Sequence, residues 1–272
     1  MSDFMDDFFA KLFSNQAKEI INGDFYYDAD HEGDQFDETD EAHWLNGGFK
    51  RNWDYHNQSQ SWRKDIFELY DGITTKIACD GKPFMDVACG PGMGLSPMIL
   101  AKNRKIPCLA TDACSRLIKA WRCYINENLT EYNISLASFS VLNMPIKENS
   151  LDYMTSNIGI SSTRNGESGQ LQALKEIFRV LKPGGSFVTV ENEWTDMAQI
   201  AEVFRLWGKD NYYKQQEMPW RDKFVSAGFK IESESQNYLR KLAKNDNDLG
   251  EAADRFGIEI GMKFTLYVLR KS

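Results

Sequence analysis

The sequence predicts an α/β protein in which helices cover both faces of a mostly parallel β-sheet. Three observations carry this prediction. A short apolar run, 84–88, enters a glycine-rich turn and leads into an amphipathic stretch, the order expected of strand, tight loop and helix. Further apolar runs at 106–112 and 151–157 are followed by helical patterns, so strands and helices alternate. At 182–185, Lys-Pro-Gly-Gly ends a helical pattern and precedes another strand-like run.

The glycine-rich turn, 89–94, is the most informative stretch for function. Its glycines let the backbone approach a ligand closely. The helix that follows presents free N–H groups and the positive end of its dipole. A nucleotide-like or carboxylate-bearing small molecule is therefore the expected guest. A dinucleotide fingerprint would require Gly or Ala at position 95, where this chain has Leu95.

The first 62 residues predict a cap segment that precedes the main domain, 63–272. An apolar stripe at helical spacing over 1–22 predicts a helix that packs on the core. Residues 23–43 are rich in acids and predict a solvated loop, without the ligand spacing of a calcium loop. Residues 44–62 are dense in aromatics around a Gly-Gly hinge, and two interpretations stay open. The stretch is either a hydrophobic anchor or a lid whose rings reach a ligand. The lid candidates are Trp44, Trp53, Tyr55 and His56.

The second predicted strand ends in Asp112, 22 residues after Gly90. This is close to the spacing at which a βαβ ligand fold places the acid that binds a ribose. A carboxylate accepts hydrogen bonds from both vicinal hydroxyls. A helix N-cap role for the same aspartate is compatible with this function.

The remaining pattern predicts strands and helices up to the C-terminus. Strands are expected at 135–141, 151–157, 186–190, 229–238 and 262–269, and helices at 171–181 and 195–207. A polar-aromatic stretch at about 208–220 is expected to be a cap-like insertion, and 240–257 a polar connection.

Three linked motifs resemble those of the class I S-adenosylmethionine (SAM)-dependent methyltransferases, in the broad group that contains the ubiquinone and menaquinone biosynthesis enzymes. The first is an acid, Asp86, followed by the Gly-x-Gly-x-Gly of 90–94. The second is the stretch 143–152, with Asn143 where the family usually has aspartate. The third is the helix-turn-strand run 173–185. The resemblance implies a Rossmann-like, seven-stranded, mostly parallel sheet with an antiparallel last strand, to which the N-terminal segment adds a helical cap.

The resemblance also implies SAM as the cofactor, S-adenosylhomocysteine as its product, and a set of contacts. The glycine turn would lie against the methionine part of SAM, and Asp112 would hold the ribose. Asn143 and Met144, which follow the third predicted strand, would flank adenine. Asp86 would meet the methionine amino group directly or through water, and Asn157 would lie near the transferred methyl. The full expected cofactor set is Asp86, Ala88, Gly90, Pro91, Gly92, Asp112, Ala113, Asn143, Met144 and Asn157.

The acceptor is expected to be a small molecule, by exclusion. A net charge of −8 and a pI near 5.1 argue against a nucleic-acid partner. No apolar run is long enough to span a membrane, the cysteines lack metal-site spacing, and a cytoplasmic location is expected. No catalytic residue is assigned, because the three histidines precede the core and a loop histidine is more often simply exposed. The alternatives are a non-catalytic SAM-binding protein and, less favoured, a nicotinamide-dependent reductase.

Overall fold

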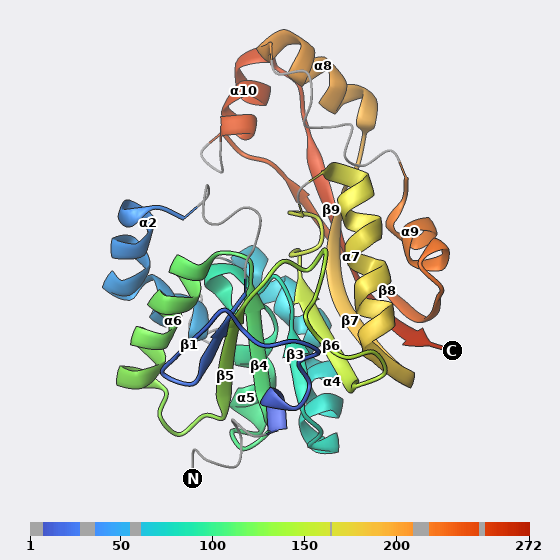
Figure 1. Ribbon diagram of the computed structural model, residues 1–272. Coiled ribbons are helices and arrows are strands. Elements are labelled where there is room, and N and C mark those ends of the chain that lie inside the picture. Colours follow the sequence, from blue (N-terminus) through green and yellow to red (C-terminus); the bar gives the residue numbers. More distant parts are fainter. Residues whose placement is uncertain (1–7, 28–35, 55–60, 164, 209–217, 245–247) are drawn as a thin grey trace.

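The computed structural model describes residues 8–27, 36–54, 61–163, 165–208, 218–244 and 248–272. Within them, one sheet of nine strands has the order β1-β2-β5-β4-β3-β6-β7-β9-β8 (Figure 1). The strands are β1 Glu19–Ile21, β2 Asp24–Tyr26, β3 Phe84–Asp86, β4 Cys108–Asp112, β5 Ile134–Ser138, β6 Leu151–Asn157, β7 Leu181–Trp194, β8 Phe229–Lys241 and β9 Gly261–Lys271.

The predicted seven strands form the part of this sheet from β5 to β8. Strands β5, β4, β3, β6 and β7 are parallel, and β9 lies antiparallel between β7 and β8. The expected mostly parallel sheet with an antiparallel last strand is therefore confirmed. The chain builds outward from β3 to β5 and then returns to the other side of β3 to form β6. The carboxyl ends of β3 and β6 thus flank a topological switch point, where open α/β sheets bind ligands.

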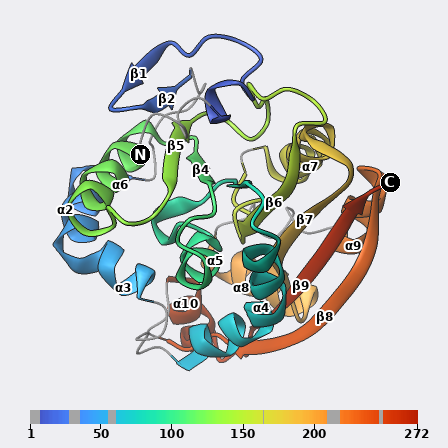
Figure 2. The ribbon, with the colours of Figure 1, turned by 90° about the horizontal axis from the view of Figure 1, so that it is seen from below.

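Helices cover both faces of the sheet. Figure 2 shows α4, α5 and α6 on one side and α7 and α9 on the other. Each side has its own apolar core, as expected for strands buried on both faces. The helices are α2 Glu38–His43, η1 Trp44–Gly48, α3 Phe49–Trp53, α4 Ser61–Asp80, η3 Gly90–Gly92, α5 Ser96–Lys102, α6 Ser115–Asn128, α7 Gly166–Val180, α8 Met197–Trp207, α9 Trp220–Ser226 and α10 Asp248–Phe256.

The N-terminal segment differs from the single helix expected over 1–22. A short helical turn at 8–10 is followed by a bridge from Phe13 to Ile146, and then by the β1–β2 hairpin. The hairpin turns at Asn22-Gly23, and both residues have positive φ. An Asn-Gly pair is a strong signal for a two-residue hairpin turn, and the helical interpretation overlooked it. Strand β2 then pairs in parallel with β5 and widens the sheet.

The acidic stretch 23–43 is not one solvated loop, because it begins within the hairpin. Asp24 is fully buried, and both of its carboxylate oxygens accept hydrogen bonds from Arg122 of α6, at 2.7 and 2.5 Å. This pair ties the hairpin to the helix layer. Asp37 caps α2 through the amides of Thr39 and Asp40. Residues 28–35 lie outside the described part of the chain.

The expected polar connection at 240–257 contains a helix, α10, that the sequence analysis missed. It packs on α8 to form a small apolar cluster that includes Ile200, Phe204 and Leu249. These two helices stand beyond the ends of β7, β8 and β9, at the top of Figure 1. Most of the expected insertion, 209–217, lies outside the described residues, and Pro219 precedes α9 as its N-cap.

Candidate functional site

The glycine turn lies at the carboxyl end of the central strand β3. The backbone there takes left-handed conformations at Ala88, Gly90, Met93 and Gly94, which fold the turn tightly onto the start of α5. A Cβ built on Gly92 would have only Asn52 Nδ2 near it, at 3.9 Å, and one built on Gly90 would meet nothing within 4 Å. The outer surface of the turn is therefore open at both positions, as a backbone that cradles a ligand requires.

Asp86 is a buried acid beneath this turn. Its Oδ2 accepts hydrogen bonds from the Leu95 amide at 2.7 Å, from Thr155 Oγ1 at 2.8 Å and from Ser96 Oγ at 3.3 Å. Burial raises its pKa to about 7, against the opposing effect of these donors. Asp86 was expected to meet the methionine amino group directly or through water. The structure shows a fully buried side chain that holds the turn to α5 and β6, and its contact with a ligand stays a prediction.

Asp112 joins the glycine turn to the next strand end. Its Oδ2 accepts from the Gly90 amide at 2.9 Å and its Oδ1 from the Cys114 amide at 3.0 Å. Burial raises the pKa of this carboxyl, while the backbone donors oppose the rise. The expected N-cap role of Asp112 is wrong, because Cys114 is the N-cap of α6 and the helix has no side-chain cap hydrogen bond. The Asp112 side chain lies at the strand end where a ribose acid is expected. Ala113 follows directly and is partly exposed.

Asn143 and Met144 follow β5 on a loop that α7 holds. The Met144 amide donates to Glu176 Oε2 at 2.9 Å, and Arg179 donates to the carbonyls of Met144 and Ile146. Asn143 is exposed. At the start of this loop, the Phe139 amide donates to the Asp112 carbonyl at 3.1 Å, which ties the loop to the expected ribose acid.

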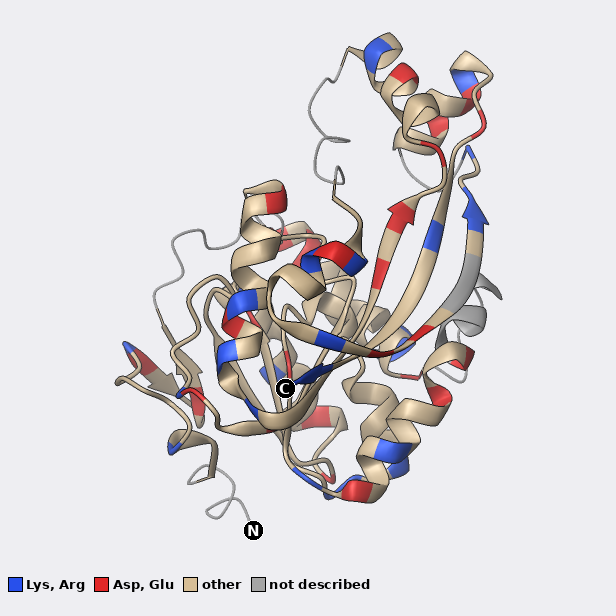
Figure 3. Cartoon of the chain, turned by 90° about the vertical axis from the view of Figure 1, so that its right-hand side faces the viewer, with Lys and Arg blue, Asp and Glu red and all other residues tan. Residues whose placement is uncertain are grey.

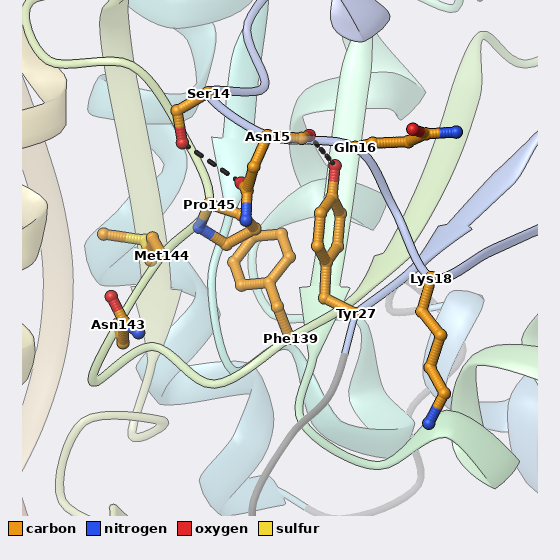
Figure 4. Close-up of a pocket in the computed structure, with 9 residues that line it drawn as sticks. All are labelled: Ser14, Asn15, Gln16, Lys18, Tyr27, Phe139, Asn143, Met144 and Pro145. Atoms are coloured by element: carbon orange, nitrogen blue, oxygen red, sulfur yellow. Dashed lines mark hydrogen bonds between the residues drawn. The ribbon is translucent and has the colours of Figure 1, made fainter.

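A hollow of about 310 Å³ lies between this loop and the N-terminal segment (Figure 4). Its walls combine polar side chains of the N-terminal segment with aromatic rings. They are formed by Ser14, Asn15, Gln16, Lys18, Tyr27, Phe139, Asn143, Met144 and Pro145. Asn143 and Met144 therefore line a hollow that they share with the N-terminal segment. The assignment of these two residues to adenine stays a prediction.

Asn157 ends β6 at the switch point and is partly exposed. Its Oδ1 accepts a 2.7 Å hydrogen bond from the hydroxyl of Tyr70, a fully buried residue of α4. The sequence analysis did not single out Tyr70, because 87 residues separate the two partners.

A family model decides the identity of this arrangement. The ubiE/COQ5 methyltransferase family matches residues 49–251. The chain belongs to this family. Its members are SAM-dependent methyltransferases, so the family implies SAM as the methyl donor. The match favours methyl transfer over both the nicotinamide-dependent and the non-catalytic alternatives.

Individual relatives agree with the family. A demethylmenaquinone methyltransferase of Listeria monocytogenes is 24% identical over 210 residues, which cover 76% of this chain and 78% of the relative. A demethylmenaquinone methyltransferase of Staphylococcus epidermidis is 26% identical over 152 residues, which cover 56% of this chain and 58% of the relative. Among solved structures, a Bacillus halodurans methyltransferase has a TM-score of 0.54 at 17% identity, covering 74% of this chain and 97% of that one. The MccD protein has a TM-score of 0.57 at 16% identity, and the match covers 75% of this chain and 97% of that one. These structures share the fold.

The aromatic segment of this ubiE/COQ5 family member packs mostly as an anchor. Phe49 is fully buried against Trp121, with ring centroids 4.1 Å apart, and Trp53 packs edge-on against Trp121 and Tyr132. Trp53, expected to face the site, is buried in this aromatic cluster. Trp44 is partly buried over Phe49.

Among the described residues of this segment, Asn52 reaches the glycine turn, and its Nδ2 donates to the Pro91 carbonyl at 3.4 Å. Trp121 fixes the same turn through a hydrogen bond from Nε1 to the Gly90 carbonyl. In the described part of the segment, the hydrogen bond to the glycine turn comes from an amide, and the rings of Trp44 and Trp53 pack in the aromatic cluster. Tyr55 and His56 lie outside the described residues.

A second group of buried ionisable residues lies beyond the end of β6, between β7 and α9. Glu191 of β7 is fully buried, accepts from Thr189 Oγ1 at 2.8 Å, and has a pKa that burial raises to about 8. Lys223 of α9 is also buried and donates to Gln170 Oε1 at 2.7 Å. Burial lowers the pKa of Lys223, while nearby glutamates oppose this.

No group of metal-ligating side chains occurs among the residues that the structure describes, and none of the described helices could cross a membrane. Seen from the side in Figure 3, Lys and Arg are interspersed with Asp and Glu along the long strands and the helices. The absence of a nucleic-acid partner stays a prediction.

Proposed function

We propose that this methyltransferase binds SAM across the carboxyl ends of β4, β3 and β6 and methylates a small-molecule acceptor. The observation that carries the proposal is the open glycine turn at the switch point, since a Cβ at Gly92 would enter free space and not the protein. In this assignment Gly90, Pro91 and Gly92 border the methionine part, and Asp112 with Ala113 borders the ribose.

The residues fit a cationic cofactor. Asp112 places a carboxyl group at the turn and Asp86 lies buried beneath it, and among the described residues no lysine or arginine is bonded to either. Bound SAM would supply a sulfonium, which is already a good leaving group. The chain's own contribution is to align the acceptor with the methyl and to keep water out. Asn157, at the end of β6, is the polar side chain proposed to lie nearest the reacting atoms.

The relatives suggest the first acceptor to test. Because two relatives are demethylmenaquinone methyltransferases, reduced demethylmenaquinone is a rational probe, and the acceptor class is part of this proposal. Binding is tested separately from transfer. Calorimetric titration with S-adenosylhomocysteine should show one site per chain, and mass spectrometry of the purified protein should detect SAM or its product. Absence of binding would refute the proposed cofactor site.

A further inference from the structure

The side-chain carboxamide of Asn157 is hydrogen-bonded to the described part of the protein through its oxygen. Asn157 pairs with Val190 of β7 at the end of the parallel ladder, beside the crevice between β3 and β6. Its Oδ1 accepts the 2.7 Å hydrogen bond from Tyr70. Among the described residues, none accepts a hydrogen bond from its Nδ2. Since a carboxamide carries its oxygen and nitrogen on opposite sides, a donor nitrogen is left for another partner.

Tyr70 is suited to fix this orientation permanently. It is fully buried in the core between α4 and the sheet, so its ring cannot move away without exposing apolar surface. Burial raises the pKa of its phenol, and the nearby acids Glu191 and Asp86 raise it further. The hydroxyl therefore keeps its proton at neutral pH and remains a donor, so it selects the amide oxygen.

The position of Asn157 indicates which ligand its nitrogen serves. The residues proposed to border the methionine part and the ribose follow β3 and end β4, on one side of the crevice, whereas Asn157 ends β6 on the other side. Beyond β6 come β7 and the α8–α10 pair, which stands above the sheet on that same side (Figure 1). The acceptor must approach the methyl opposite the sulfur, which leaves this side for it.

We propose that Tyr70 is a positioning residue that orients Asn157 so that Nδ2 donates a hydrogen bond to an oxygen of the methyl acceptor. The inference rests on the proposed function and narrows the acceptor to molecules with a hydroxyl or carbonyl oxygen at or next to the accepting atom. In transfer, the acceptor's electron pair forms the new bond to the methyl carbon. The S–C electron pair returns to sulfur, and the acceptor's proton passes to water. The Asn157 donor stabilises the acceptor oxygen as it carries negative charge.

The first experiment separates the acceptor from the cofactor as the partner of Asn157. Tyr70→Phe and Asn157→Ala should bind S-adenosylhomocysteine within about threefold of the parent protein by calorimetry. Tyr153→Phe is the matched control, because it also removes a tyrosine hydroxyl bonded near β6, but at the opposite end of the strand. A loss of tenfold or more in Tyr70→Phe or Asn157→Ala, but not in the control, would assign Asn157 to the cofactor and overturn the inference. No binding by the parent protein would instead refute the proposed function.

The second experiment observes the orientation directly. In protein labelled with ¹⁵N-asparagine, the Asn157 side-chain amide pair is identified by its absence in Asn157→Ala. With S-adenosylhomocysteine bound, this pair should shift in Tyr70→Phe and stay in place in Tyr153→Phe. A pair that is unchanged in Tyr70→Phe contradicts the positioning role.

The third experiment measures transfer of tritiated methyl to reduced demethylmenaquinone. Asn157→Ala should lower kcat about 100-fold, as expected for loss of one donor to a developing oxyanion, and Tyr70→Phe about tenfold, with KM for SAM unchanged. Normal kcat in both variants overturns the inference. Absence of transfer by the parent protein refutes the quinol acceptor, and the amide spectrum still decides the role of Tyr70.

Discussion

Two glycines of the same turn, Gly92 and Gly94, should respond differently to substitution by a residue with a side chain: the first should lose ligand affinity and the second should lose stability. At Gly92 an added Cβ has its nearest neighbour, Asn52 Nδ2, at 3.9 Å, an ordinary van der Waals contact, and the residue is partly exposed. The Gly92→Val variant should therefore fold with a change in unfolding free energy within about 1 kcal/mol. It should lose S-adenosylhomocysteine affinity at least about 100-fold, or roughly 2.7 kcal/mol, because the branched side chain occupies the ligand's space.

Gly94 provides the matched control. A Cβ there would overlap the buried Asp86 carboxylate, with its Cγ only 2.5 Å away, and φ is +55°. A left-handed alanine costs about 1–2 kcal/mol and overpacking about 1–3 kcal/mol, so Gly94→Ala should lose roughly 2–5 kcal/mol of stability. For a chain of this size that lowers Tm by at least about 4 °C.

Urea or thermal unfolding and calorimetric titration of both variants measure these effects together. The expected outcome is a stable Gly92→Val that does not bind and a destabilised Gly94→Ala. Two results would refute the reasoning. Normal affinity in Gly92→Val would mean that the ligand does not pass the turn. Unfolding of Gly92→Val to the same extent as Gly94→Ala would mean that the turn is packed by protein and is not open to a ligand.

Four other predictions concern the site and its supports. Asp112→Ala should weaken SAM binding by about 1.5–3 kcal/mol, measured by calorimetry, and unchanged affinity would remove the ribose assignment. Glu191 has a folded pKa of about 8, above its unfolded value, so the neutral acid's contribution to stability is complete below about pH 4 and is lost as pH rises towards 8. Glu191→Gln should flatten the fall in unfolding free energy over that range, and an unchanged pH profile would contradict the burial argument. Arg122→Met should destabilise by about 3–5 kcal/mol because it removes the guanidinium that donates to both oxygens of the buried Asp24 carboxylate, and the double variant with Asp24→Leu should recover most of this loss in urea unfolding. If residues 44–62 form a lid, S-adenosylhomocysteine should slow their hydrogen exchange, whereas indifference would leave only the aromatic anchor.

The alternation of strands and helices was predictable because each unit carries its own local pattern. The central strands are short apolar runs that end in polar residues, and the sequence placed Asp86, Asp112 and Asn157 at strand ends. The β1–β2 hairpin was missed although Asn22-Gly23 signals it, because the preceding apolar residues at helical spacing dominated the interpretation. Helix α10 was missed although Leu249, Ala252, Ala253 and Phe256 lie at helical spacing, because polar residues dominate the stretch 240–257 and the packing partner, α8, lies about 50 residues away.

The partners of the site residues could not be predicted from local pattern. Tyr70 meets Asn157, and Glu176 meets the amide of Met144, only because the fold brings α4 and α7 to these loops. Trp53 shows the converse. Its place in an aromatic-rich stretch suggested a ligand contact, but the groove beside Trp121 and Tyr132 buries the ring first. Periodicity states which face of a helix is apolar, and does not state which neighbour covers it.

The N-terminal hairpin has a consequence for how the chain is made. Its partners all lie far along the sequence: β2 pairs with residues 137 and 138, and Asp24 bonds Arg122. Before the hairpin, the Leu12 carbonyl accepts a hydrogen bond from the Lys147 amide. A ribosome delivers these partners only after about a hundred or more further residues have been synthesised. The hairpin segment, which is synthesised before its partners, must therefore wait and dock late, onto a sheet whose β5 edge is already formed. During that wait Phe13 and Phe25 are exposed to water, and this is when a chaperone or a neighbouring chain can bind them.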